Sequence, residues 1–128
     1  MFTAALSALL IVHGLLHLAI WMPHPNPDAG KPPPFVPDHS TLLTATRVPK
    51  AATHQLSIAL AAGSAAGFVL TGVGVALSAG WAVPMAIASA LLGLCLKGVF
   101  FHPWLIIGVL FDLTVLSAAI LQWPLALT

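Results

Sequence analysis

The chain has 128 residues, of which four are Lys or Arg and three are Asp or Glu, whereas 59% are hydrophobic. Soluble globular domains carry about 25% charged residues, so this composition excludes a water-soluble fold and indicates an integral membrane protein. A net charge of +1 also excludes a nucleic-acid-binding protein, because four cations offer no row of charges for phosphates.

Four stretches are long and apolar enough to cross a bilayer, whose hydrocarbon core needs about 20 apolar residues per helix. Residues 1–27 carry no formal charge, and residues 51–96 form a second charge-free run that is long enough for two helices with a turn at 78–80. The segment 103–124 is apolar except for Asp112. We therefore predict an all-α, membrane-spanning four-helix bundle that is a single domain over residues 1–128. Its spans are expected near residues 3–22, 50–78, 82–100 and 103–123.

The tryptophans and the cations support this count of spans. Each Trp falls at a predicted helix end, where its amphipathic ring suits the membrane–water interface. We expect all four to be interface anchors: Trp21, Trp81, Trp104 and Trp123. All four Lys and Arg residues belong to the loop between the first two spans or to the junction of the last two. The positive-inside rule then predicts that both termini lie outside the cytoplasm.

A Pro-rich loop, residues 23–48, joins the first two spans. Seven of the eleven prolines lie between Pro23 and Pro37, a density that favours extended polyproline II structure. We expect a stiff connector, with a docking strand for a partner's aromatic groove as the alternative. A short interfacial helix, capped by Asp38 or Ser40 and ending near Thr46, is expected before Pro49 opens the next span.

Small residues recur at four-residue spacing in the second span. The stripe consists of Ala59, Gly63, Gly67 and Thr71, and such a stripe lets another helix approach closely. It serves either packing within the bundle or contact with another membrane protein.

Histidines and one aspartate are the most informative polar residues. His13 and His17 share a helix face at i and i+4, a spacing that can give two ligands to one metal ion. Counted from Trp21 and Trp104 at 1.5 Å per residue, His13 and Asp112 each lie about 12 Å deep, so they can meet. A carboxylate inside the membrane needs a partner, and we expect His13 first and Lys97 second.

The same cluster allows two interpretations. His13, His17 and Asp112 form a candidate metal site, to which His54 or His102 can add a ligand, for Cu, Zn, Fe or haem. Alternatively, these residues only satisfy each other and fix the helix register. Lys97 on its own is expected to snorkel from its helix end to the interface.

The His13-Gly-Leu-Leu-His-Leu sequence, the Pro-rich loop followed by a short polar helix, and Phe101-His-Pro-Trp with Asp112 downstream resemble a group of small four-span bacterial membrane proteins. The resemblance implies the four-span topology and the cytoplasmic (inner) membrane of a bacterium, and it brings no activity, cofactor or catalytic residue.

Two functions follow as hypotheses. No catalytic motif is present in the sequence, so an enzyme is not expected. The first hypothesis is a non-catalytic accessory or assembly subunit that packs against other membrane protein subunits of a larger complex. A respiratory or metal-dependent oxygenase complex is an example. The alternative is a metal-binding or haem-binding membrane module or small carrier that uses the His13, His17 and Asp112 cluster.

Overall fold

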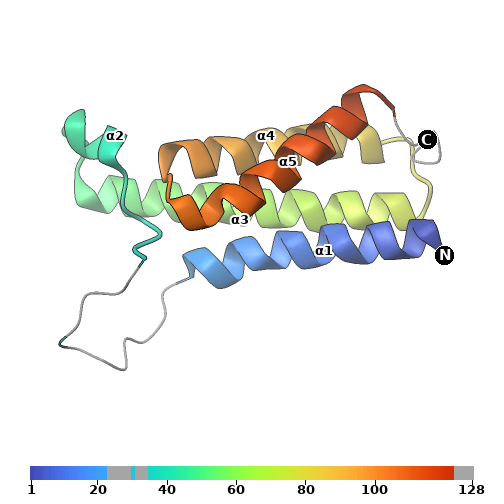
Figure 1. Ribbon diagram of the computed structural model, residues 1–128, viewed down its shortest axis with the longest axis horizontal. Coiled ribbons are helices and arrows are strands. Elements are labelled where there is room, and N and C mark those ends of the chain that lie inside the picture. The colour runs from blue at the N-terminus through green and yellow to red at the C-terminus, as the bar shows by residue number, and fades with distance from the viewer. Residues whose placement is uncertain (23–29, 31–34, 123–128) are drawn as a thin grey trace.

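A computed structural model describes residues 1–22, 30 and 35–122, and it has the predicted all-α, four-helix membrane architecture (Figure 1). Four helical segments are long and apolar enough to cross a membrane. They are α1 (Phe2–Trp21), α3 (Lys50–Ala76), α4 (Ala82–Val99), and the segment Pro103–Ile120, in which a 3₁₀ turn, η1 (Pro103–Leu105), leads into α5 (Ile106–Ile120). The four predicted spans thus correspond to these helical segments, whose ends differ from the predicted ones by a few residues.

The helices form an open arrangement in which each packs on the next along the chain. α1 packs on α3, α3 on α4, and α4 on α5, whereas α1 and α5 are not a closely packed pair (Figure 1). α1 begins and α5 ends at the same end of the bundle, which we call the terminal end. The opposite end, where α1 ends and α3 begins, is called the loop end. One side of the bundle therefore stays open between α1 and α5.

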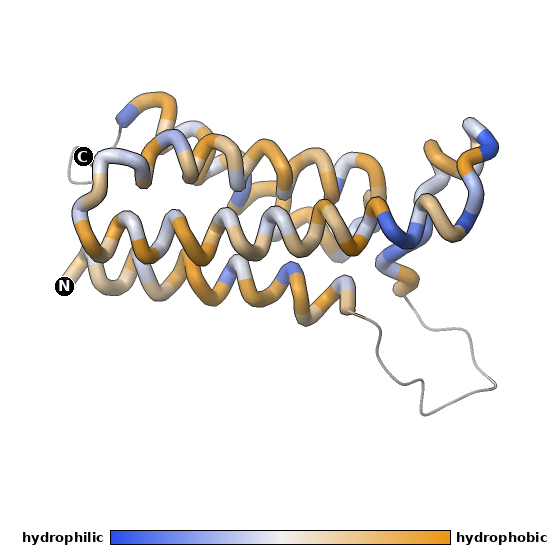
Figure 2. Tube along the Cα trace, turned by 180° about the vertical axis from the view of Figure 1, so that it is seen from behind, coloured by the Kyte–Doolittle hydropathy of each residue, from blue (hydrophilic) through white to orange (hydrophobic). Residues whose placement is uncertain are grey.

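Hydrophilic residues gather at the loop end, around α2 (Thr41–Ala45) (Figure 2). Ser40 is the N-cap of this helix, as predicted, because its Oγ accepts the backbone N–H of Leu43 at 3.2 Å. The same hydroxyl donates to the carbonyl oxygen of Val99, at 2.6 Å, and so ties α2 to the last residue of α4. Trp21 donates its indole N–H to the carbonyl oxygen of Pro37, at 2.9 Å. The predicted extended structure of the loop falls mainly on residues 23–34, most of which lie outside the described residues.

Small residues bring the helices together inside the bundle. Gly67 leaves room for the hydroxyl of Ser89 on α4, and Thr71 approaches the same hydroxyl at 3.3 Å. Gly63 is half-buried beside Leu92, and Ala59 is exposed. Three of the four residues of the predicted stripe therefore face α4, which favours packing within the bundle over contact with another protein.

The contact between α1 and α3 is equally close. Ser7 donates its hydroxyl to the carbonyl oxygen of Gly72 at 2.7 Å. A Cβ atom on Gly14 would lie 2.8 Å from the carbonyl oxygen of Ala65, so the two backbones touch at this glycine. This approach holds the face of α1 that carries His13 and His17 against the rest of the bundle.

We expect Gly14→Ala to lower the free energy of unfolding by about 1–3 kcal/mol, because the added methyl meets backbone that cannot turn aside. Gly63→Ala is the matched control. Its Cβ would have a nearest neighbour at 3.7 Å, and Ala favours helix over Gly by about 1 kcal/mol, so its stability should be unchanged or raised. Thermal unfolding in detergent measures both variants. Equal stability of the two would contradict the close α1–α3 contact.

Candidate functional site

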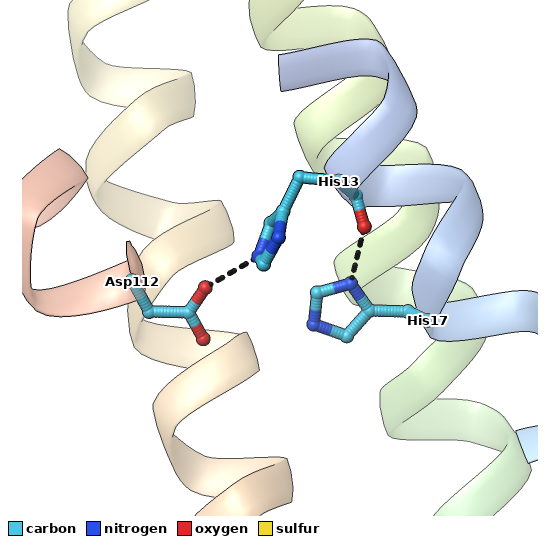
Figure 3. A group of neighbouring side chains, drawn as sticks. All are labelled: His13, His17 and Asp112. Atoms are coloured by element: carbon cyan, nitrogen blue, oxygen red, sulfur yellow. Dashed lines mark hydrogen bonds and ion pairs between the residues drawn. The ribbon is translucent and has the colours of Figure 1, made fainter. Parts of the chain in front are cut away.

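Asp112 of α5 lies at the centre of a buried hydrogen-bonded network. The Nε2 atom of His13 lies 2.8 Å from the Oδ1 atom of Asp112, so the predicted pair is confirmed (Figure 3). Asp112 is fully buried, and His13 is 8% exposed. The pair links α1 to α5, which also meet through an apolar cluster that includes Leu10 of α1 and has Val115 of α5 packed against it.

Lys97 of α4 is the second partner of the carboxylate, and the expectation that it snorkels to the interface is wrong. Its Nζ atom lies 2.6 Å from the Oδ2 atom of Asp112 and 2.7 Å from the Nε2 atom of His17. Lys97 is only 3% exposed. The ammonium stays inside the protein because the Asp112 carboxylate and a ring nitrogen of His17 accept its hydrogen bonds there. These acceptors replace the water molecules that would solvate it at the interface.

The hydrogen-bonding partners assign the donor and acceptor roles of three of the four ring nitrogens. A carbonyl oxygen only accepts, so Nδ1 of His17 donates to the carbonyl oxygen of His13, at 3.0 Å, and its Nε2 accepts from the ammonium of Lys97. A carboxylate also only accepts, so Nε2 of His13 donates to Asp112. His17 is therefore neutral, and the charges of Asp112 and Lys97 cancel.

Two glycines make the space for this network. A side chain on Gly93 would overlap the Oδ2 atom of Asp112, and a Cβ on Gly108 would lie 2.7 Å from Cε of Lys97.

Two phenylalanine rings pack against His13. Phe111 stacks on it with ring centroids 4.0 Å apart, and Phe68 meets it edge-on with centroids 4.7 Å apart. The two histidine rings are thus packed among aromatic side chains.

A groove between α1 and α5 runs past the network. Its loop-end part is a cavity of about 290 Å³ whose walls include His13, His17 and Lys97. Its terminal-end part is a cavity of about 160 Å³ that is lined almost entirely by apolar side chains. Leu9 and Phe111 line both cavities, so the two parts are neighbours along one groove.

Other predicted site residues lie elsewhere. His54 is exposed and pairs with the carboxylate of Asp38, its Nδ1 atom 2.9 Å from Oδ2. Nδ1 of His102 accepts the backbone N–H of Trp104 at 3.2 Å. Neither histidine joins His13, His17 and Asp112, the group whose potential ligand atoms lie within 4.8 Å of one another in the described part of the chain.

The predicted interface anchors stand at helix ends where the structure describes them. Trp81 precedes α4 and is exposed, and Trp104 lies in η1 and is also exposed. Trp21 ends α1 but is buried, with only 4% of its surface exposed, because it belongs to an apolar cluster that includes Leu96 and Phe100. Trp123 lies outside the described residues.

A metal ion at this cluster would compete with Lys97. Two imidazoles and a carboxylate are a suitable ligand set for Zn, Cu or Fe. The ammonium, however, is hydrogen-bonded to His17 and Asp112, two of the three prospective ligands. Metal or haem binding by these residues stays a prediction, and it requires that Lys97 move away.

No protein-family model, curated protein or solved structure matches this chain in the comparisons made.

Substitutions of Asp112 test the charge balance. Asp112→Leu leaves the Lys97 ammonium buried without a counter-charge, and we expect a loss of about 3–5 kcal/mol in the free energy of unfolding. Asp112→Asn keeps an oxygen acceptor and should lose less. The double variant Lys97→Met/Asp112→Leu removes both charges and should regain most of the loss. Thermal unfolding in detergent gives the order of these variants.

Asp38→Asn is the matched control for this series, because the carboxylate of Asp38 is 40% exposed in its pair with His54. Its cost should stay below about 1 kcal/mol. If Asp112→Leu is as stable as the wild type, the network does not hold the helices together.

Lys97→Met tests the metal hypothesis. Removing the ammonium frees Nε2 of His17 and one oxygen of Asp112, so Zn²⁺ or Co²⁺ should bind this variant more tightly than the wild type. The metal content after loading and dialysis, together with the absorption spectrum of bound Co²⁺, measures this. His17→Ala in the Lys97→Met background should abolish the gain. A Lys97→Met protein that retains no metal would exclude the cluster as a metal site.

Proposed function

We propose that the chain is a small membrane protein that binds a lipid-soluble molecule in the groove between α1 and α5. The network of His13, Asp112, Lys97 and His17 is the polar end of this site, and the apolar part of the groove holds the tail. Ligand sites are typically apolar hollows with a few convergent polar groups, and this groove has that composition. The observation that carries the proposal is that three members of one buried polar network line a groove whose remainder is apolar.

The groove is accessible from the lipid. Val12, Leu16 and Ile107 line its loop-end part and are 53%, 50% and 77% exposed, so this part opens sideways between the helices. A molecule dissolved in the bilayer can therefore enter without crossing a polar surface. Ionisable residues inside a membrane are costly and usually mark function, which further supports a role for the network beyond packing.

The proposed location is the cytoplasmic membrane of a bacterium, with both termini outside the cytoplasm. Arg47 and Lys50 lie at the loop end, which the positive-inside rule assigns to the cytoplasmic side. The polar network, only a few turns from the same end of α1, would then open to the inner leaflet.

Filling the groove tests the proposed site. Leu16→Trp places a large side chain in it, whereas Leu15→Trp, at a residue of similar exposure (52%) that is not among the residues lining the groove, is the matched control. Protein purified in mild detergent is extracted with organic solvent, and the retained molecules are identified by mass spectrometry. We expect one class of lipid-soluble molecule to be retained by the wild type and the control, and to fall several-fold in Leu16→Trp. Equal retention of ordinary phospholipids by all three proteins would contradict the proposal.

The accessory-subunit hypothesis is the second candidate, because a transmembrane helix of another protein could also close the open side between α1 and α5. The burial of most of the small-residue stripe inside the bundle weakens its original basis. This hypothesis predicts that a protein partner co-purifies in stoichiometric amount in mild detergent. The partner should be lost from Leu16→Trp and retained by Leu15→Trp. A 13.2 kDa monomer without a partner after cross-linking would contradict it.

A further inference from the structure

The charge of the network limits which head group fits beside it. Asp112 and Lys97 carry opposite charges 2.6 Å apart, so the network has no net charge when both histidine rings are neutral. A phosphate, carboxylate or ammonium entering the groove would therefore add a charge without a counter-charge in a medium that solvates charges poorly. The head group that fits is uncharged.

His13 provides an unused hydrogen-bond acceptor. Its Nε2 donates to Asp112, and no described residue accepts a hydrogen from Nδ1, as a doubly protonated ring would require; in the neutral ring Nδ1 carries a lone pair without a partner. Among the described residues, Ser64 Oγ is the sole fully buried side-chain polar atom without a hydrogen-bond partner. Nδ1 of His13 also has no partner, so it must be accessible from outside the protein interior. The side chain of His13 is 10% exposed and lines the groove. A head group there must offer a hydrogen to Nδ1.

Lys97 provides an unused donor at the same place. An ammonium carries three N–H groups, of which His17 and Asp112 accept two. Lys97 lines the same part of the groove as His13. A hydroxyl can donate to a ring nitrogen and accept from an ammonium, whereas a carbonyl or an ether oxygen can only accept.

The groove also has room for a long tail. Its apolar part reaches Phe2, eleven residues before His13, which is roughly 16 Å along α1 at 1.5 Å per residue. The side chains that line this part offer nothing polar to the tail except two threonine hydroxyls.

We infer that the groove binds a lipid-soluble alcohol or phenol, whose hydroxyl donates to Nδ1 of His13 and accepts from Lys97. This inference rests on the proposed function and adds the chemical class of the ligand. The tail is apolar and lies along α1, and the source of the hydroxyl is either an isoprenoid alcohol or a hydroquinone.

The test is binding of tritiated farnesol to the purified protein in detergent, with displacement by unlabelled probes. Farnesol should displace the label at about tenfold lower concentration than farnesyl methyl ether, which has the same tail but no donor, because one hydrogen bond is lost. Decylubiquinol and decylubiquinone form a second pair, and stronger displacement by the quinol than by farnesol would identify a phenol as the preferred head group.

Variants locate the effect. His13→Phe keeps a ring against Phe111 but removes Nδ1, and it should bring the ratio of alcohol to ether close to one. If the wild type binds alcohol and ether equally and Leu16→Trp abolishes both, the hydroxyl inference is wrong while the groove remains a ligand site. If no probe binds above the level of protein-free detergent, both proposals fail. The comparison of alcohol with ether in the wild type does not depend on how well any variant folds.

Discussion

The sharing of one carboxylate between two helices organises this protein. Asp112 on α5 accepts a hydrogen bond from His13 on α1 and another from Lys97 on α4, and Lys97 in turn donates to His17. An isolated carboxylate at this depth would cost at least about 2.5 kcal/mol, so the helices are held where the carboxylate is satisfied. α1 and α5 meet through this polar link, through the stack of Phe111 on His13 and through a small apolar cluster, while their backbones stay apart.

Counting residues predicted much of this arrangement. Charge-free length located the four spans, and depth from the tryptophans paired His13 with Asp112. Lys97 was named only as the second candidate partner of Asp112 and was expected to snorkel, because its position near the end of α4 allows a side chain to point either outward or inward. Gly93 and Gly108 are the signals that decide it, since they provide space for Asp112 and Lys97. That space is recognised only when the packing of α4 against α5 is known.

For the small-residue stripe, the sequence predicted the kind of contact but not the partner. Its spacing correctly indicated close approach of a helix, but the sequence cannot identify the helix. Ser89 of α4 occupies the space beside Gly67, so most of the stripe is used within the chain. The unpartnered surface instead lies between α1 and α5, where exposed apolar residues such as Ile107 adjoin buried polar ones. This contrast is the basis for the proposal of a ligand site in the membrane.

The protonation of His13 is the point on which the network and its proposed role both depend, and nitrogen NMR of ¹⁵N-histidine-labelled protein reports it directly. Spectra of His13→Gln and His17→Gln proteins assign the two rings. We expect two neutral rings of opposite tautomer, with the proton on Nε2 in His13 and on Nδ1 in His17. A doubly protonated His13, or a proton on its Nδ1 in place of Nε2, would contradict the account, because the acceptor that faces the groove would not exist.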